Sequence, residues 1–193
     1  MARKGKNTRK RRPSVRALMS RSAKKERNVP YLEELQLALS HQAAGHLGQA
    51  EEILQRVLAH KSNHAMALKL LGRLYCDSGR VEQGIQCLER CVQCEPGELS
   101  NYIELGHVLR VTGRRDAAEQ VLLKGIGLKS NDPQAHYELG CLYHDQTKLE
   151  LASAELNLAL KLNPDHIAAR QRLGEVHQAL GQSSEAEACF RRV

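Results

Sequence analysis

Hydrophobic residues recur at intervals of three and four from residue 31 to the end of the chain, the spacing of amphipathic α-helices. Polar, Gly- or Pro-containing turns such as Asn131-Asp132-Pro133 separate the periodic stretches. The chain is therefore expected to be all-α. The expected helix pairs are 31–43 with 47–60, 65–77 with 81–94, 99–111 with 115–128, 133–145 with 149–162, and 167–179 with 183–193.

The pair Leu71-Gly72 recurs every 34 residues, as Leu105-Gly106, Leu139-Gly140 and Leu173-Gly174, with a weaker copy at Leu37-Ala38. Copies that stay in register without insertions are typical of stacked repeats, which need at least about three units to bury a continuous core. The predicted repeats are residues 31–64, 65–98, 99–132, 133–166 and an incomplete 167–193, preceded by residues 1–30.

Each copy carries the same marks after its Leu-Gly pair. The glycine of the pair itself falls inside a predicted helix, where glycine costs about 1 kcal/mol relative to alanine. We therefore expect the two helices of a copy to approach too closely at this glycine for a larger residue. The turn residues are Gly45, Gly79, Gly113 and Gly181, with Thr147 as the exception. The small residues are Ala50, Gly84, Ala118, Ala152 and Ala186, and the large apolar ones are Leu54, Leu88, Leu122, Leu156 and Phe190.

These marks resemble those of the tetratricopeptide repeat family. Its Leu-Gly-x2-Tyr element stands as Leu71-Gly72 with Tyr75 and as Leu139-Gly140 with Tyr143, and its closing proline as Pro96 and Pro164. The leading Trp is absent, since Glu34, Leu68, Tyr102, His136 and Arg170 stand there. The resemblance covers residues 31–193 and implies a right-handed superhelical solenoid whose first helices line a concave groove.

The resemblance also implies a non-catalytic adaptor that holds a peptide or a partner helix in this groove. Carried over by register, the groove residues are Lys69, Arg73, His107, Arg110, Tyr137 and His144. The first four would suit an acidic segment, or they would form a merely solvated face. The carboxylate clamp of chaperone co-factors is not matched, because Arg73 stands where that clamp has Asn.

Charge is unevenly distributed along the chain. Residues 1–28 contain 12 Lys and Arg against the single acid Glu26, whereas the remainder contains 17 basic and 21 acidic residues. Such a basic arm is expected to be disordered. Arg9, Lys10, Arg11 and Arg12 would bind nucleic acid without sequence specificity, in a nucleic-acid- or ribosome-associated factor; an address signal and an inert tail are the alternatives.

Cys87, Cys91 and Cys94 have the spacing with which radical S-adenosylmethionine enzymes hold an iron–sulfur cluster. Their equivalents in other copies are mostly apolar, however, so we interpret them as packing residues rather than cluster or zinc ligands. No metalloprotease, nucleophile-elbow or P-loop motif occurs. We therefore expect no catalytic site in the repeats, no cofactor and no metal.

No run of about 18 apolar residues predicts a membrane span, and no apolar centre follows the basic start as in a secretory signal. We expect a cytoplasmic protein, with a nuclear location as the alternative. The last predicted helix places Phe190 and Val193 on a packing face without a polar cap. That end would self-associate or meet a partner, or the repeats would be the docking segment of a larger transferase-type enzyme.

Overall fold

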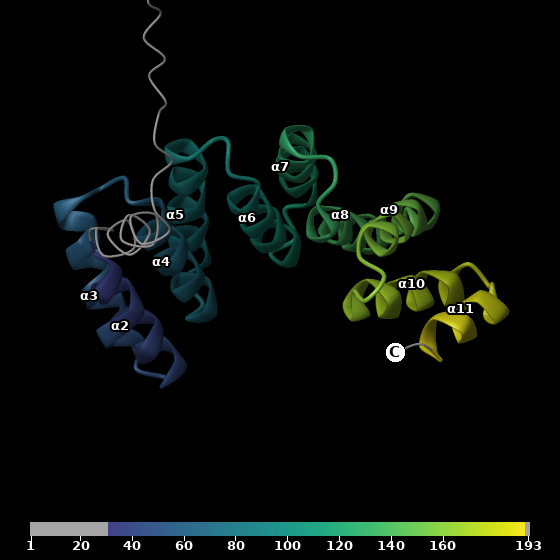
Figure 1. Ribbon diagram of the computed structural model, residues 1–193, viewed down its shortest axis with the longest axis horizontal. Helices are drawn as coiled ribbons and strands as arrows, with labels where there is room; N and C mark the ends of the chain where they lie inside the picture. Colours follow the sequence, from purple (N-terminus) through teal and green to yellow (C-terminus); the bar gives the residue numbers. More distant parts are fainter. Residues whose placement is uncertain (1–30, 192–193) are drawn as a thin grey trace, which may run out of the picture.

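The computed structural model describes residues 31–191 (Figure 1). The predicted basic arm, with Arg9 to Arg12, and Val193 lie outside this part. The described chain forms ten α-helices and begins with the pair α2 (Leu32–Ala43) and α3 (Leu47–His60). The others are α4 (Ala65–Asp77), α5 (Val81–Cys94), α6 (Leu99–Val111), α7 (Arg115–Leu128), α8 (Pro133–Asp145), α9 (Leu149–Leu162), α10 (Ile167–Ala179) and α11 (Ser183–Phe190).

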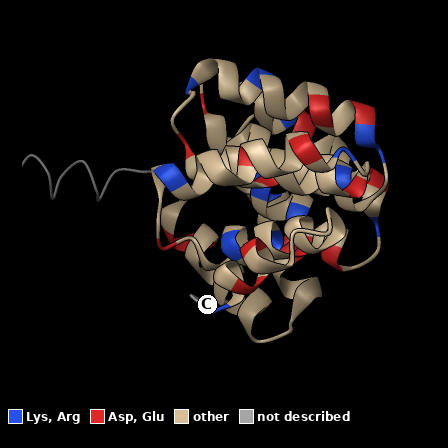
Figure 2. Ribbon diagram, turned by 90° about the vertical axis from the view of Figure 1, so that its right-hand side faces the viewer, with Lys and Arg blue, Asp and Glu red and all other residues tan. Residues whose placement is uncertain are grey.

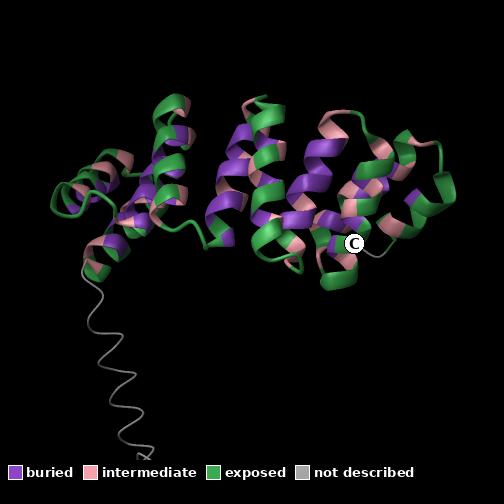
Figure 3. Cartoon of the chain, turned by 90° about the horizontal axis from the view of Figure 1, so that it is seen from above, coloured by how far each residue is buried: buried purple, intermediate pink, exposed green. Residues whose placement is uncertain are grey.

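Consecutive helices pack as helix–turn–helix pairs, and successive pairs stack side by side along the molecule (Figure 1). Buried residues lie where the helices face one another, and exposed residues cover the outside (Figure 3). The all-α solenoid predicted from the sequence is confirmed. No helix within residues 31–191 is long and apolar enough to cross a membrane.

The turn within each pair needs a residue in the left-handed region of backbone conformation. Gly79 has φ of 80°, and its neighbour closes the turn through a hydrogen bond from Arg80 N to Tyr75 O of 2.8 Å. Glycine adopts this conformation without steric cost. In the fourth copy Thr147 stands in this place with φ of 61°, an unfavourable conformation for a β-branched residue.

Close approach explains the glycines inside the first helices. A Cβ on Gly106 would lie 2.5 Å from Leu122 Cδ2, and one on Gly140 would lie 2.7 Å from Leu156 Cγ. Gly72 and Gly174 meet Leu88 and Phe190 in the same way. The large apolar residue of the second helix thus occupies the space that a side chain at the glycine position would need, as the repeat register predicted.

In three copies the side chain at the position of the missing Trp forms a hydrogen bond to the loop between copies. Tyr102 Oη donates to the carbonyl oxygen of Pro96 at 2.9 Å, six residues earlier. His136 and Arg170 bond to the equivalent carbonyls of Ser130 and Pro164. Leu68 has no donor, and there Arg90 of α5 donates to Ser62 O at 2.8 Å instead. Each of these four loop carbonyls is therefore hydrogen-bonded.

The core is divided near the middle of the solenoid. One large cluster of buried residues joins the first two copies and runs from Leu35 to Cys87, and another runs from Ile85 to Val176. Among the first helices, α2 packs on α4, α6 on α8, and α8 on α10. The backbones of α4 and α6 lie further apart, and long side chains bridge them, such as Lys69 to Ser100 and Arg73 to Glu104. We call this place the α4–α6 joint.

Candidate functional site

The inner surface is formed by the first helices, because these helices contact their counterparts in neighbouring copies. The predicted groove residues all lie on them: Lys69 and Arg73 on α4, His107 and Arg110 on α6, and Tyr137 and His144 on α8. The structure does not gather their charges into one basic patch. Lys and Arg are interspersed with Asp and Glu along the helices (Figure 2).

Most of the inner basic side chains pair with an acid of the next copy. Arg73 Nε lies 3.2 Å from Glu104 Oε1, and His107 Nδ1 lies 3.1 Å from Glu138 Oε2. Both pairs join residues 31 positions apart, so the same contact is repeated one unit further along. Arg110 Nη1 donates to Asp145 Oδ2 at 2.7 Å. These cations therefore tie neighbouring repeats together.

Glu138 is the centre of the tightest of these contacts. It is only 4% exposed, and it accepts a hydrogen bond from Gln134 Nε2 at 3.2 Å. Arg110 Nε lies 3.5 Å from Glu138, which is within ion-pair range, although that nitrogen makes no hydrogen bond. The hydrogen bond with Glu138 raises the pKa of His107, because the carboxylate favours the imidazolium form. This cluster joins α6 to α8.

Tyr137 contacts the next copy, whereas His144 makes a local contact. The Tyr137 ring lies 4.9 Å from that of His166 in the next copy. His144 Nδ1 lies 3.7 Å from Asp145 Oδ1 and forms no hydrogen bond. Neither of them lines the cavity that lies beside Lys69.

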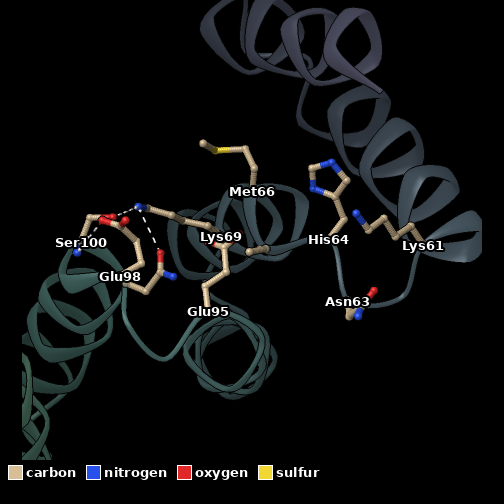
Figure 4. A pocket seen from close by; sticks show the side chains of 10 residues that line it. Lys61, Asn63, His64, Met66, Lys69, Glu95, Glu98 and Ser100 are labelled. Carbon is tan, nitrogen blue, oxygen red and sulfur yellow. Dashed lines mark hydrogen bonds between the residues drawn. The ribbon is translucent and has the colours of Figure 1, made fainter. Parts of the chain in front are cut away.

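Lys69 differs from the other predicted cations. Its ammonium donates to Ser100 Oγ at 3.0 Å and to Asn101 Oδ1 at 3.5 Å, both neutral groups of α6 (Figure 4). Within residues 31–191 no carboxylate lies within ion-pair distance of it. Lys69 is thus held in place without a counter-ion.

A cavity of about 290 Å³ opens beside Lys69 at the α4–α6 joint. Figure 4 shows its lining side chains, which come from the starts of α4 and α6 and, with Lys61, Asn63 and His64, from the end of α3 and the loop before α4. Its walls include Met66, Glu95, Glu98, Ser100 and Asn101. Glu98 is partly engaged, since its side chain accepts a hydrogen bond from Ser100 N at 3.4 Å as the N-cap of α6.

Asn101 is the unusual residue of this cavity. It is 3% exposed, and its equivalents in the second, fourth and fifth copies, Ala67, Ala135 and Ala169, are fully buried alanines. Its Nδ2 has no hydrogen-bond partner, and a buried unpaired amide costs about 1–3 kcal/mol. A residue that weakens the fold beside a cavity marks a candidate binding site.

The cysteines lie in packing positions, as expected. Cys91 is buried between α5 and α4, with its Sγ 3.3 Å from Ala65 O. Burial raises the pKa of its thiol to about 11, so the thiolate that a metal needs is disfavoured. Cys87 is also buried in the core.

Comparison with known proteins supports the repeat assignment. Sequence profiles described as tetratricopeptide repeat match residues 41–105, and a second such profile matches 99–132, 133–166 and 167–193. Several solved structures share the fold. MamA 41-end from Desulfovibrio magneticus RS-1 has a TM-score of 0.71 at 20% identity, covering 82% of this chain and 90% of that one. TTC0263, a thermophilic TPR protein of Thermus thermophilus, has a TM-score of 0.69 at 23% identity, covering 83% and 88%.

Two curated relatives are longer proteins. The human protein O-mannosyl-transferase TMTC1 is 28% identical over an alignment 192 residues long, gaps included, which covers 79% of this chain and 21% of that protein. Tetratricopeptide repeat protein 8 of Caenorhabditis elegans is 22% identical over 156 residues, covering 80% and 31%. This chain therefore spans between about a fifth and a third of their length.

Proposed function

Because this chain belongs to the tetratricopeptide repeat family, we propose that it is a non-catalytic adaptor that holds an acidic segment of a partner protein. The segment lies on the inner surface, with one carboxylate at Lys69 and Asn101 in the cavity of the α4–α6 joint. The observation that carries the proposal is the unpaired charge of Lys69 beside a buried amide with a free donor.

A ligand carboxylate would supply the counter-ion that Lys69 lacks. Lys69 has three ammonium donors, of which Ser100 and Asn101 occupy two with neutral oxygens. A carboxylate would accept the third in a charge-assisted hydrogen bond, about twice as strong as a neutral one. A half-turn of the Asn101 amide, which exchanges Oδ1 with the buried Nδ2, would let the amide donate to the same group in place of its contact with Lys69.

The surrounding residues restrict the ligand further. Two carboxylates, Glu95 and Glu98, line the cavity together with the ammonium groups of Lys61 and Lys69. This balanced lining favours a single ligand carboxylate over a run of acidic residues. Met66 is half-exposed at the same cavity and offers a flexible apolar contact. The expected motif is therefore one Asp or Glu next to an apolar side chain.

Selection from a library of random linear dodecapeptides tests this proposal. The library is selected in parallel on the full chain, on Lys69→Met and on Arg115→Met, which removes an exposed cation of the outer helix α7. We expect the wild type and Arg115→Met to enrich peptides with one fixed acidic position. Lys69→Met should lose this preference, and bound peptides should weaken about tenfold.

Enrichment of the same acidic peptides by Lys69→Met would refute the site. Enrichment of apolar peptides by all three proteins would leave peptide binding intact but refute the acidic ligand. Absence of any enriched peptide on correctly folded wild type would count against the adaptor function as a whole.

A second candidate is the docking segment of a larger transferase-type enzyme, with the same groove as its substrate- or partner-binding part. The observation in its favour is the relative named as an O-mannosyl-transferase, of which this chain matches about a fifth. An antibody against residues 31–193 would detect an endogenous protein of about 21.6 kDa for the adaptor. A much heavier band would favour the enzyme.

A further inference from the structure

An apolar stripe lies on the outer face of α9. Leu151 is 50% exposed, Leu158 is 36% exposed, and the exposed residues Ala154 and Leu162 continue the same row. Their spacing of three, four and four residues places them on one side of the helix. The opposite side of α9 is buried in the core through Leu156 and its neighbours.

The repeat register shows that the fold does not require this stripe. The residues equivalent to 151, 154 and 158 are polar or small in the preceding copies. They are Gln49, Glu52 and Arg56 in the first copy, Gln83, Gln86 and Arg90 in the second, and Ala117, Gln120 and Lys124 in the third. The fourth position, Leu162, corresponds to His60, Cys94 and Leu128, so the first three positions are the ones that distinguish α9. Exposed apolar residues that recur in a row mark an interaction surface.

Two residues of opposite charge lie beside the stripe, one near each end of α9. Glu150 lies in the first turn of α9 and Lys161 in its last turn. The two are eleven residues apart, close to three full turns, so they flank the stripe on the same side. In the described part of the chain neither of them has an ion-pair partner.

We propose that this surface binds a second copy of the chain, with the two α9 helices packed antiparallel about a two-fold axis. Antiparallel packing brings Glu150 of each copy to Lys161 of the other, because residues on the same side of two such helices meet. It also sets the helix dipoles in opposite directions. The stripe and its flanking charges are thus complementary to themselves, as a two-fold interface requires.

The axial positions of the side chains fit this arrangement. When Glu150 is level with Lys161 of the second copy, Leu151 falls between Leu158 and Leu162 of that copy at a rise of about 1.5 Å per residue. Ala154 lies near the centre, where a small side chain lets the helices approach. The leucines of each helix then fill the spaces between those of the other.

This interface is separate from the peptide site, since it uses a second helix rather than the inner surface. One helix pair is small compared with stable protein interfaces, so we expect dissociation constants in the micromolar range. Each dimer would present two grooves, which strengthens binding to a partner with two acidic segments.

Sedimentation equilibrium of the full chain tests the proposal at concentrations up to about 200 μM, well above the expected dissociation constant. We expect a mass approaching twice 21.6 kDa for the wild type. Leu151→Glu and Leu158→Glu should weaken association at least tenfold. Leu37→Glu, at a residue 48% exposed on α2, is the matched control and should leave it unchanged.

Charge reversal tests the orientation. Glu150→Lys and Lys161→Glu should each weaken the dimer, and the double variant should restore it. A wild type that is monomeric throughout this concentration range would overturn the proposal. A dimer that survives Leu151→Glu would also overturn it, and failure of the double variant to restore association would refute the antiparallel pairing.

Discussion

Replacing Asn101 with alanine should stabilise the protein. The substitution removes a buried amide whose Nδ2 is unpaired, a gain of about 1–3 kcal/mol. Alanine also has a better helix propensity by about 0.6 kcal/mol. The lost contact with Lys69, at 3.5 Å from an exposed ammonium, offsets less than about 0.5 kcal/mol.

The net effect on the free energy of unfolding is therefore an increase of about 1–3 kcal/mol, or roughly 2–12 °C in Tm for a chain of this length. Thermal unfolding by circular dichroism measures it. Asn157→Ala, at an exposed position of α9, controls for helix propensity, although it also removes exposed hydrogen bonds of Asn157 Nδ2 to Ser153 at 2.9 and 3.3 Å. The reverse change, Ala135→Asn, inserts an amide at an equivalent buried position and should destabilise by about 2 kcal/mol.

A Tm of Asn101→Ala at or below that of Asn157→Ala would refute the reasoning, because the amide would then be satisfied in solution. If the prediction holds, the same variant should bind acidic peptides less tightly. Asn101 would then be a residue that lowers stability in favour of binding.

Three further predictions concern the repeat framework. Gly106→Leu should lower the free energy of unfolding by about 3 kcal/mol, because the new side chain would overlap Leu122 of α7. Gly127→Ala, at an open position, is the control, and an unchanged Tm of Gly106→Leu would contradict the close-approach explanation. Thr147→Gly should stabilise by about 1 kcal/mol by relieving its positive φ, and a lower urea midpoint would argue against strain there. His107 has a pKa raised by its hydrogen bond with Glu138, so its stabilising contribution is fully present below the unfolded pKa of about 6.5 and is lost as pH rises through the higher folded pKa. The stability of wild type relative to His107→Gln should therefore fall as pH rises above about 6.5, and a pH-independent difference would refute the pair.

The helices and their close contacts could be predicted from the sequence, because each copy repeats the same local pattern. The turn glycines, the exception at Thr147 and the glycines opposite Leu88, Leu122 and Leu156 all follow from the 34-residue register. These features depend on a helix and its immediate partner. A single repeat therefore contains the information that defines them.

The arrangement of charges on the inner surface could not be predicted in this way. Arg73 and His107 pair with acids 31 residues away, so their availability to a ligand depends on the side chains of the next copy. The joint between α4 and α6 likewise depends on packing over two copies. Asn101 was detectable in the sequence, as an amide among equivalent alanines, but its burial and its unpaired nitrogen required the structure.

A double-mutant cycle tests the central claim most directly. Isothermal titration calorimetry would measure the selected acidic peptide and its carboxamide counterpart against wild type and Lys69→Met, with both proteins and both peptides in the same buffer. A direct contact between Lys69 and the carboxylate predicts a coupling energy of about 1 kcal/mol or more. A coupling energy within about 0.3 kcal/mol of zero would show that the carboxylate binds elsewhere, and the proposed site would be wrong.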